Sequence, residues 1–131
     1  MLVDDNADDN FFHAREIKKT HLHTIVVTKE SGTKALEYLK EKTEPHSDLI
    51  FLDINMPGMN GWEFLKEYDK LDKVLQSRAI IIMLTTSDNP DDVAKANTNN
   101  FVSDYITKPL TKEIMEDINK KYFSQEQYSK N

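Results

Sequence analysis

The feature that most constrains the fold of this chain is a run of four apolar residues, 49–52, that leads directly into Asp53. A short apolar run without polar alternation is typical of a strand buried on both faces, as in a parallel sheet covered by helices. Pro57 and Gly58 follow and favour a turn. Asp53 is therefore predicted to lie where a buried strand gives way to a loop, and ligands bind at that edge of open α/β sheets.

Length and composition indicate one globular domain. The chain has 131 residues, of which 38% are hydrophobic and 31% charged, and this is enough for one sizeable core under a charged surface. The formal net charge of −6, without a block of lysines and arginines, argues against direct nucleic-acid binding. Because cysteine, a signal peptide and any apolar run of about 18 residues are absent, no membrane association is expected and the cytoplasm is the expected location.

Short apolar strands alternate with amphipathic helices along the chain. Strands are predicted at 1–3, 22–28, 49–53, 79–84 and 102–107, and helices at 9–19, 31–42, 61–74, 91–97 and 111–122. This pattern predicts an α/β fold of the flavodoxin-like (βα)5 type, a doubly wound, five-stranded parallel sheet in the order 2-1-3-4-5. The first strand is shorter than the roughly 5–6 residues of a typical strand, so a few further residues are expected upstream.

Several expectations concern single side chains. Ser31 and Thr111 are predicted N-caps, and the first helix has three candidate caps, which are Asp8, Asp9 and Asn10. Its candidate inward positions are Phe12, Ile17 and either Phe11 or Ala14. The four histidines are expected at the surface, because none lies at helical spacing from another metal-ligand residue; they are His13, His21, His23 and His46.

Polar residues stand at the ends of four predicted strands. Asp4 and Asp5 end the first, Asp53 the third, Thr85 the fourth and Lys108 the fifth. Because the ends of parallel strands lie on one side of the sheet, these groups are expected to converge. Clustered carboxylates raise at least one pKa unless a cation is supplied, and oxygen ligands suit Mg2+. A carboxylate nucleophile beside a divalent ion, a lysine and a hydroxyl is what phosphoryl transfer to aspartate needs.

The motifs around these residues resemble the receiver domain of two-component response regulators. They are Val3-Asp4-Asp5-Asn6, Asp53-Ile-Asn-Met-Pro-Gly58, Leu84-Thr-Thr-Ser87 and Tyr105-Ile-Thr-Lys108-Pro109. Each motif alone is weak, but jointly they are highly specific, and the resemblance covers about residues 1–122. Residues 1–123 are therefore expected to form a receiver domain and 124–131 a polar tail, without an output domain after the last helix.

The resemblance implies a role for each acid. Asp53 is the expected phospho-acceptor. Asp5, the Asp53 carboxylate and the backbone carbonyl of Asn55 are the expected Mg2+ ligands, with Asp4 closer to the next layer around the ion.

The resemblance also implies the residues that respond to the phosphoryl group. Thr85 is the expected switch hydroxyl and is preferred over Thr86 because it directly follows the apolar run. Lys108 is expected to pair with a phosphoryl oxygen, and Tyr105 matches the aromatic switch position. Asn55 and Ser87 occupy positions that tune dephosphorylation; since neither is a strong base, a long-lived phosphoryl state is the hypothesis.

Three functions are weighed. The first is a signalling switch, not a turnover enzyme, which takes a phosphoryl group from a sensor histidine kinase or a histidine phosphotransfer protein and changes a surface for a downstream protein. The alternative is a phosphohydrolase with Asp53 as transient nucleophile. Such enzymes typically carry a second acid two residues later, where this chain has Asn55. The third is a degenerate binding module, against which the intact acids, Thr85 and Lys108 argue.

Overall fold

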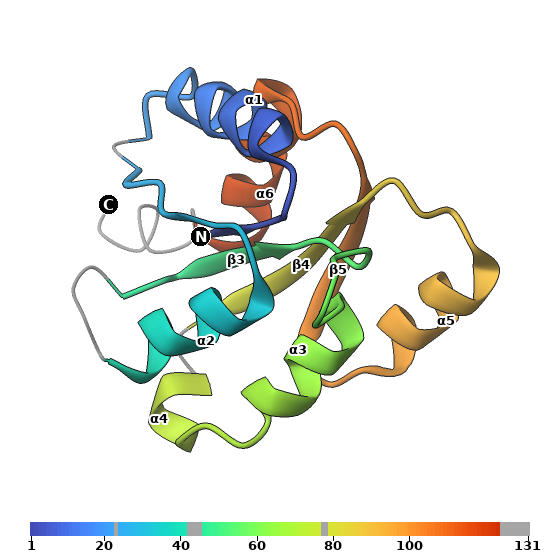
Figure 1. The fold of residues 1–131 in the computed structure, drawn as a ribbon. Helices are drawn as coiled ribbons and strands as arrows, with labels where there is room; N and C mark the ends of the chain where they lie inside the picture. Colours follow the sequence, from blue (N-terminus) through green and yellow to red (C-terminus); the bar gives the residue numbers. More distant parts are fainter. Residues whose placement is uncertain (23, 42–45, 77–78, 124–131) are drawn as a thin grey trace.

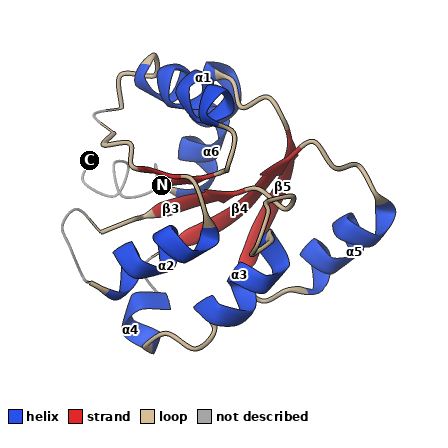
Figure 2. Cartoon of the chain, in the orientation of Figure 1, coloured by secondary structure: helices blue, strands red, loops and turns tan. Residues whose placement is uncertain are grey.

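The predicted fold is confirmed by the computed structural model, which describes residues 1–22, 24–41, 46–76 and 79–123. Five parallel strands form one sheet in the order β2-β1-β3-β4-β5, with helices on both faces (Figures 1 and 2). The strands are β1 (Leu2–Val3), β2 (Thr28–Lys29), β3 (Leu49–Leu52), β4 (Ile80–Thr85) and β5 (Val102–Thr107). The predicted tail, 124–131, lies outside the described residues.

The helices form two layers around this sheet. They are α1 (Ala7–Lys18), α2 (Gly32–Lys40), α3 (Gly61–Tyr68), α4 (Lys73–Gln76), α5 (Pro90–Thr98) and α6 (Lys112–Tyr122). In Figure 1, α1 and α6 cover one face, α2 and α3 cover the other, and α5 stands out to the side of β5. The described helices are all too short or too polar to span a bilayer.

The central strands are buried on both faces, as the apolar runs predict. Alternate side chains of a strand point to opposite faces, so β3 and β4 contribute to two separate cores. The core beneath α2 and α3 contains Ile50, Leu52, Ile81, Met83, Phe64 and Tyr68, among others. The core beneath α1 and α6 contains Phe51, Ile82, Leu84, Ile17, Met115 and Ile118, among others.

The second strand is much shorter than predicted. The sequence predicts a strand over 22–28, but β2 holds only Thr28 and Lys29, and Ile25 is 70% exposed. The neighbouring strand β1 has two residues, and both are already paired, Leu2 with Thr28 and Val3 with Lys29. Among the described residues of 22–28, only Thr28 therefore has a strand partner, which is Leu2.

The long third helix predicted over 61–74 is two helices, α3 and α4. Helix α3 ends at Tyr68. The side-chain amide nitrogen of Gln76 lies 2.7–3.1 Å from the carbonyl oxygens of Tyr68, Asp69 and Leu71. Helix ends leave carbonyl groups without partners, and Gln76 supplies donors for them. The break is thus stabilised by a side chain that lies after it in sequence.

The first helix also differs in detail. It begins at Ala7, and its N-cap is Asn6, whose side chain accepts a hydrogen bond from the Asp9 backbone, instead of any of the three predicted caps. Phe11 is 70% exposed, so of the two alternatives it is Ala14 that packs toward the core. The prediction that His13 lies at the surface is wrong, because its side chain is buried. His23 lies outside the described residues.

Candidate functional site

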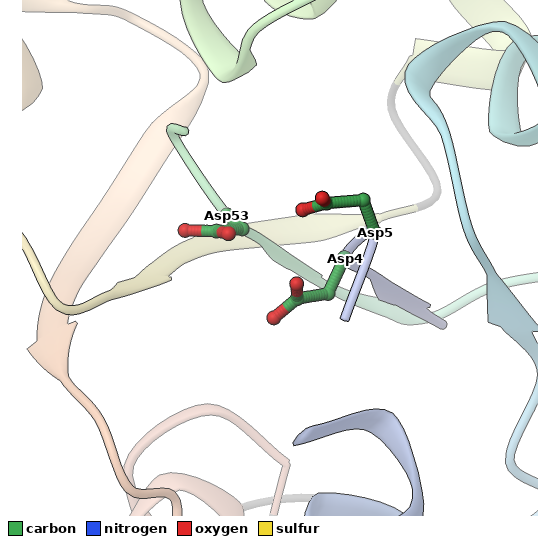
Figure 3. Close-up of side chains that lie close together, drawn as sticks. All are labelled: Asp4, Asp5 and Asp53. Atoms are coloured by element: carbon green, nitrogen blue, oxygen red, sulfur yellow. The ribbon is translucent and has the colours of Figure 1, made fainter. Parts of the chain in front are cut away.

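Three carboxylates meet where β1 and β3 end. These strands are parallel neighbours, with Val3 opposite Leu52, so Asp4 and Asp53 follow them at the same level. Both residues are buried, whereas Asp5 is exposed. One oxygen of each of the three lies within 4.8 Å of the others (Figure 3). A cluster of only oxygen ligands is the donor set that a hard divalent cation prefers.

The ammonium of Lys108 lies among these acids. Its Nζ is 2.6 Å from Asp4 Oδ2, 2.8 Å from Asp9 Oδ2 and 3.6 Å from Asp53 Oδ2. The Lys108 backbone N–H donates to the carbonyl of Thr85, which fixes the residue at the end of β5. Burial lowers the pKa of Lys108, but the hydrogen bonds to Asp4 and Asp9 outweigh it and raise the pKa above the usual value. Lys108 is therefore a permanent cation in the cluster.

The charged form of the Asp53 carboxyl is disfavoured. Burial raises its pKa, and the neighbouring Asp4 carboxylate raises it further. Lys108 and a hydrogen bond with Thr85 oppose this effect without cancelling it. A buried carboxylate under such repulsion gains stability from any added cation at the site.

Thr85, and not Thr86, faces the site. Thr85 ends β4 and is fully buried, and its Oγ1 accepts a hydrogen bond from the Ser87 N–H at 3.2 Å. Thr86 is exposed. Thr85 is therefore the threonine that contacts Asp53, and its role as the switch hydroxyl stays a prediction.

The loop after Asp53 is anchored by a glycine that the sequence marks only as part of a turn. The Gly61 N–H donates to the Ile54 carbonyl at 2.8 Å. A Cβ at Gly61 would lie 2.6 Å from the Asp53 carbonyl oxygen, too close for any other residue without a shift of the backbone. Asn55 lies exposed within this loop.

A series of hydrogen bonds connects Tyr105 and Ser87 to Asp92 and Trp62, and the sequence did not indicate these last two as part of the site. The Tyr105 hydroxyl donates to the Ser87 carbonyl. The Ser87 hydroxyl donates to Asp92 Oδ2 at 2.6 Å, and the Trp62 indole donates to Asp92 Oδ1 at 3.0 Å. Asp92 belongs to α5 and Trp62 to α3, so the loop after β4 is tied to both helices. Asp9 is the third residue missed; its only sequence signal is a possible helix cap.

The fold is a five-stranded parallel α/β sheet with acids, a lysine and a threonine gathered at one edge, and comparison with known proteins identifies the class of domain. Residues 1–119 match the family described as "Response regulator receiver domain". The chain belongs to this family. It is a receiver domain of two-component signalling, a class that generally does not turn over substrate as an enzyme.

Individual proteins agree with this assignment. The chain is 32% identical over 114 residues to Response regulator Rcp1 of a Synechocystis strain, covering 82% of this chain and 74% of that protein. It is 28% identical to a segment of Hybrid signal transduction histidine kinase L of Dictyostelium discoideum, over 88% of this chain and 7% of that protein. A crystal structure of a two-component response regulator from Cytophaga hutchinsonii superposes with a TM-score of 0.83 at 31% identity, covering 92% of both chains.

Proposed function

We propose that this protein is a phosphorylation switch that accepts a phosphoryl group on Asp53 from a phosphohistidine donor. The observation that carries the proposal is the buried Asp53 carboxylate, which lies beside two further acids, a lysine and a threonine hydroxyl. Response regulators are phosphorylated by histidine kinases, so a sensor histidine kinase or a histidine phosphotransfer protein is the proposed donor. A downstream protein of unknown identity is the proposed receiver of the signal.

The donor set fits Mg2+. The carboxylates of Asp4, Asp5 and Asp53 offer only oxygen ligands, and one oxygen of each lies within 4.8 Å of the others. In this proposal Asp5, Asp53 and the backbone carbonyl of Asn55 hold the ion, with Asp4 beside them. When bound, Mg2+ supplies positive charge against the charge on the phosphoryl oxygens.

The chain's own residues account for the transfer. An oxygen of the Asp53 carboxylate attacks the phosphorus of the phosphohistidine, and a P–O bond forms as the P–N bond breaks. The electron pair leaves with the imidazole nitrogen, and because the donor ring carries a proton on its other nitrogen, it leaves as neutral imidazole. Lys108 supplies a fixed positive charge close to Asp53, and Thr85 supplies a hydroxyl that can donate to a phosphoryl oxygen.

Dephosphorylation is proposed to be slow, because Asn55 and Ser87 offer no strong general base. In the structure the Ser87 hydroxyl donates to Asp92, which directs it toward α5. A phosphoryl half-life of seconds, measured by decay of the phosphorylated mass, would contradict this part of the proposal.

The direct test is intact mass after incubation with acetyl phosphate and Mg2+. We expect one added phosphate, which is absent in Asp53→Asn and in a sample with EDTA. Asp48→Asn is the matched control, because Asp48 is an exposed aspartate just before the opposite end of β3; this variant should be phosphorylated like the wild type.

The other outcomes identify other functions. Continuous release of inorganic phosphate that is lost in Asp53→Asn, without accumulation of an adduct, would indicate the phosphohydrolase. Neither adduct nor release would indicate a binding module. Residues 1–123 as the receiver domain, 124–131 as a polar tail and a cytoplasmic location complete the proposal.

A further inference from the structure

The Lys108 ammonium contacts two carboxylates besides that of Asp53, and one of them belongs to Asp9 on α1. A lysine ammonium has three N–H donors. In this structure Asp4 and Asp9 accept two of them, at 2.6 and 2.8 Å. Asp53 Oδ2 is 3.6 Å away, outside hydrogen-bond distance. The lysine is therefore held closer to two other acids than to the residue that it is proposed to serve.

The position of Asp9 is fixed by the helix that carries it. Asp9 lies in the first turn of α1, and its backbone N–H donates to the capping side chain of Asn6 at 3.1 Å. Its side chain is 37% exposed, whereas those of Asp4 and Lys108 are nearly buried. Asp9 thus contacts Lys108 from α1 and is the most exposed of these three side chains.

We propose that Asp9 is a positioning residue that tethers Lys108 and limits its movement onto a phosphoryl group at Asp53. The inference rests on the proposed function, since it assigns Lys108 to that phosphoryl group. One N–H donor of Lys108 remains available for a phosphoryl oxygen, but any movement of Nζ toward Asp53, 3.6 Å away, stretches at least one of its two shorter contacts with Asp4 and Asp9. The contact with Asp9 is the one to weaken, because it is the longer and the more exposed of the two.

The negative charge of Asp9, like its contact with Lys108, is expected to disfavour the phosphorylated state. Asp9 is an anion close to the space into which the phosphoryl dianion would be introduced, so it disfavours the phosphorylated state by repulsion. It also shares the positive charge of Lys108, which is then less available to the phosphoryl oxygens. Removal of the Asp9 charge should therefore favour the phosphorylated form. If Asp9 served only to hold Lys108 in the site, its removal would disfavour that form.

The test compares Asp9→Asn with wild type by fluorine NMR titration of beryllofluoride at saturating Mg2+. We expect about two- to fivefold tighter binding in Asp9→Asn, as for loss of one partly exposed ion pair that competes with the ligand. Asp8→Asn is the matched control: it removes the same charge from the same helical turn, at an exposed position, and should change binding much less. Asp9→Glu, which restores the charge, should bind more weakly than Asp9→Asn.

A second readout needs no ion. Hydrogen bonds slow the exchange of the Lys108 ammonium protons with water, so nitrogen NMR without Mg2+ should show faster exchange in Asp9→Asn than in Asp8→Asn. Equal exchange would overturn the tether, and equal or weaker beryllofluoride binding in Asp9→Asn would overturn its proposed effect. If the wild type itself binds no beryllofluoride, the proposed function fails instead, and the exchange measurement still decides whether Asp9 restrains Lys108.

Discussion

Two helices flank β5, and they are held in different ways. Helix α6 buries Met115 and Ile118 in the core that it shares with α1. Helix α5 buries only Ala96, and a groove of about 580 Å³ separates it from α3, lined in part by Trp62 and Phe101.

Polar contacts take the place of a core at α5. Its Asp92 accepts hydrogen bonds from Ser87 and from Trp62. Ser87 lies two residues after Thr85, the proposed phosphoryl contact, so the same short loop that would sense the phosphoryl group also holds α5. Because hydrogen bonds are directional and individually weak in net terms, a small movement of this loop can reposition α5, while α6 stays fixed by apolar packing.

The largest expected difference between the two helices is in stability. Ile118→Ala in α6 should lower the free energy of unfolding by about 2–5 kcal/mol, because it leaves a cavity in a closed core. Val93→Ala in α5 should cost about 1 kcal/mol or less, since Val93 is half-buried. Urea denaturation of both variants measures the free energy of unfolding. Equal losses in Ile118→Ala and Val93→Ala would contradict the claim that α5 is held by less apolar packing than α6.

On the face of the sheet covered by α1 and α6, the buried His13 should make stability depend on pH. Burial lowers the pKa of His13 and so does the nearby Lys108, while Asp9, Asp4 and Glu16 oppose them. Protonation therefore favours the unfolded chain: stability is full above pH 6.5, the unfolded value, and is lost as pH falls below it, by at most about 1.4 kcal/mol per pH unit.

Urea denaturation between pH 7 and pH 5 tests this prediction. His13→Gln should flatten the pH dependence, even if it lowers stability at all pH values. His21→Asn is the control, because His21 is exposed and has a positive φ that asparagine tolerates; its slope should match the wild type. An unchanged slope in His13→Gln would show that another group titrates.

A modest effect on stability is expected at the hydrogen bond between Trp62 and Asp92. Trp62→Phe keeps most of the ring but removes the indole donor to Asp92, so we expect a loss of about 0.5–1.5 kcal/mol. Amide hydrogen exchange should become faster in α5 and stay unchanged in α6. Asp91→Asn, at an exposed neighbour of Asp92, is the control and should leave the exchange of α5 near the wild-type rate.

The parts of the fold that sequence could predict are those fixed by local pattern. The apolar runs at 49–52 and 79–84 identify two buried strands, and Asp53 and Thr85 stand at the ends of these runs. The strand over 22–28 was wrong because strand length depends on the partner strand, which pairs only two residues. The break at Tyr68 was missed because the donor that stabilises it is supplied by Gln76.

The same limit applies to the site. Asp9 has its role through Lys108, which lies 99 residues away in sequence, and Asp92 is joined to Trp62 across 30 residues. No local spacing reports such contacts. His13 was misjudged because its spacing from other metal-ligand residues says nothing about burial, and it lies on the buried side of α1 with Asn10 and Ile17.

Amide hydrogen exchange with and without beryllofluoride, at saturating Mg2+, tests the central claim most directly. We predict that exchange changes in residues 86–98, the loop after β4 and α5, and not in α6, and that Asp53→Asn shows no change in either segment. A change confined to α6, or none in residues 86–98 although beryllofluoride is bound, would contradict the account.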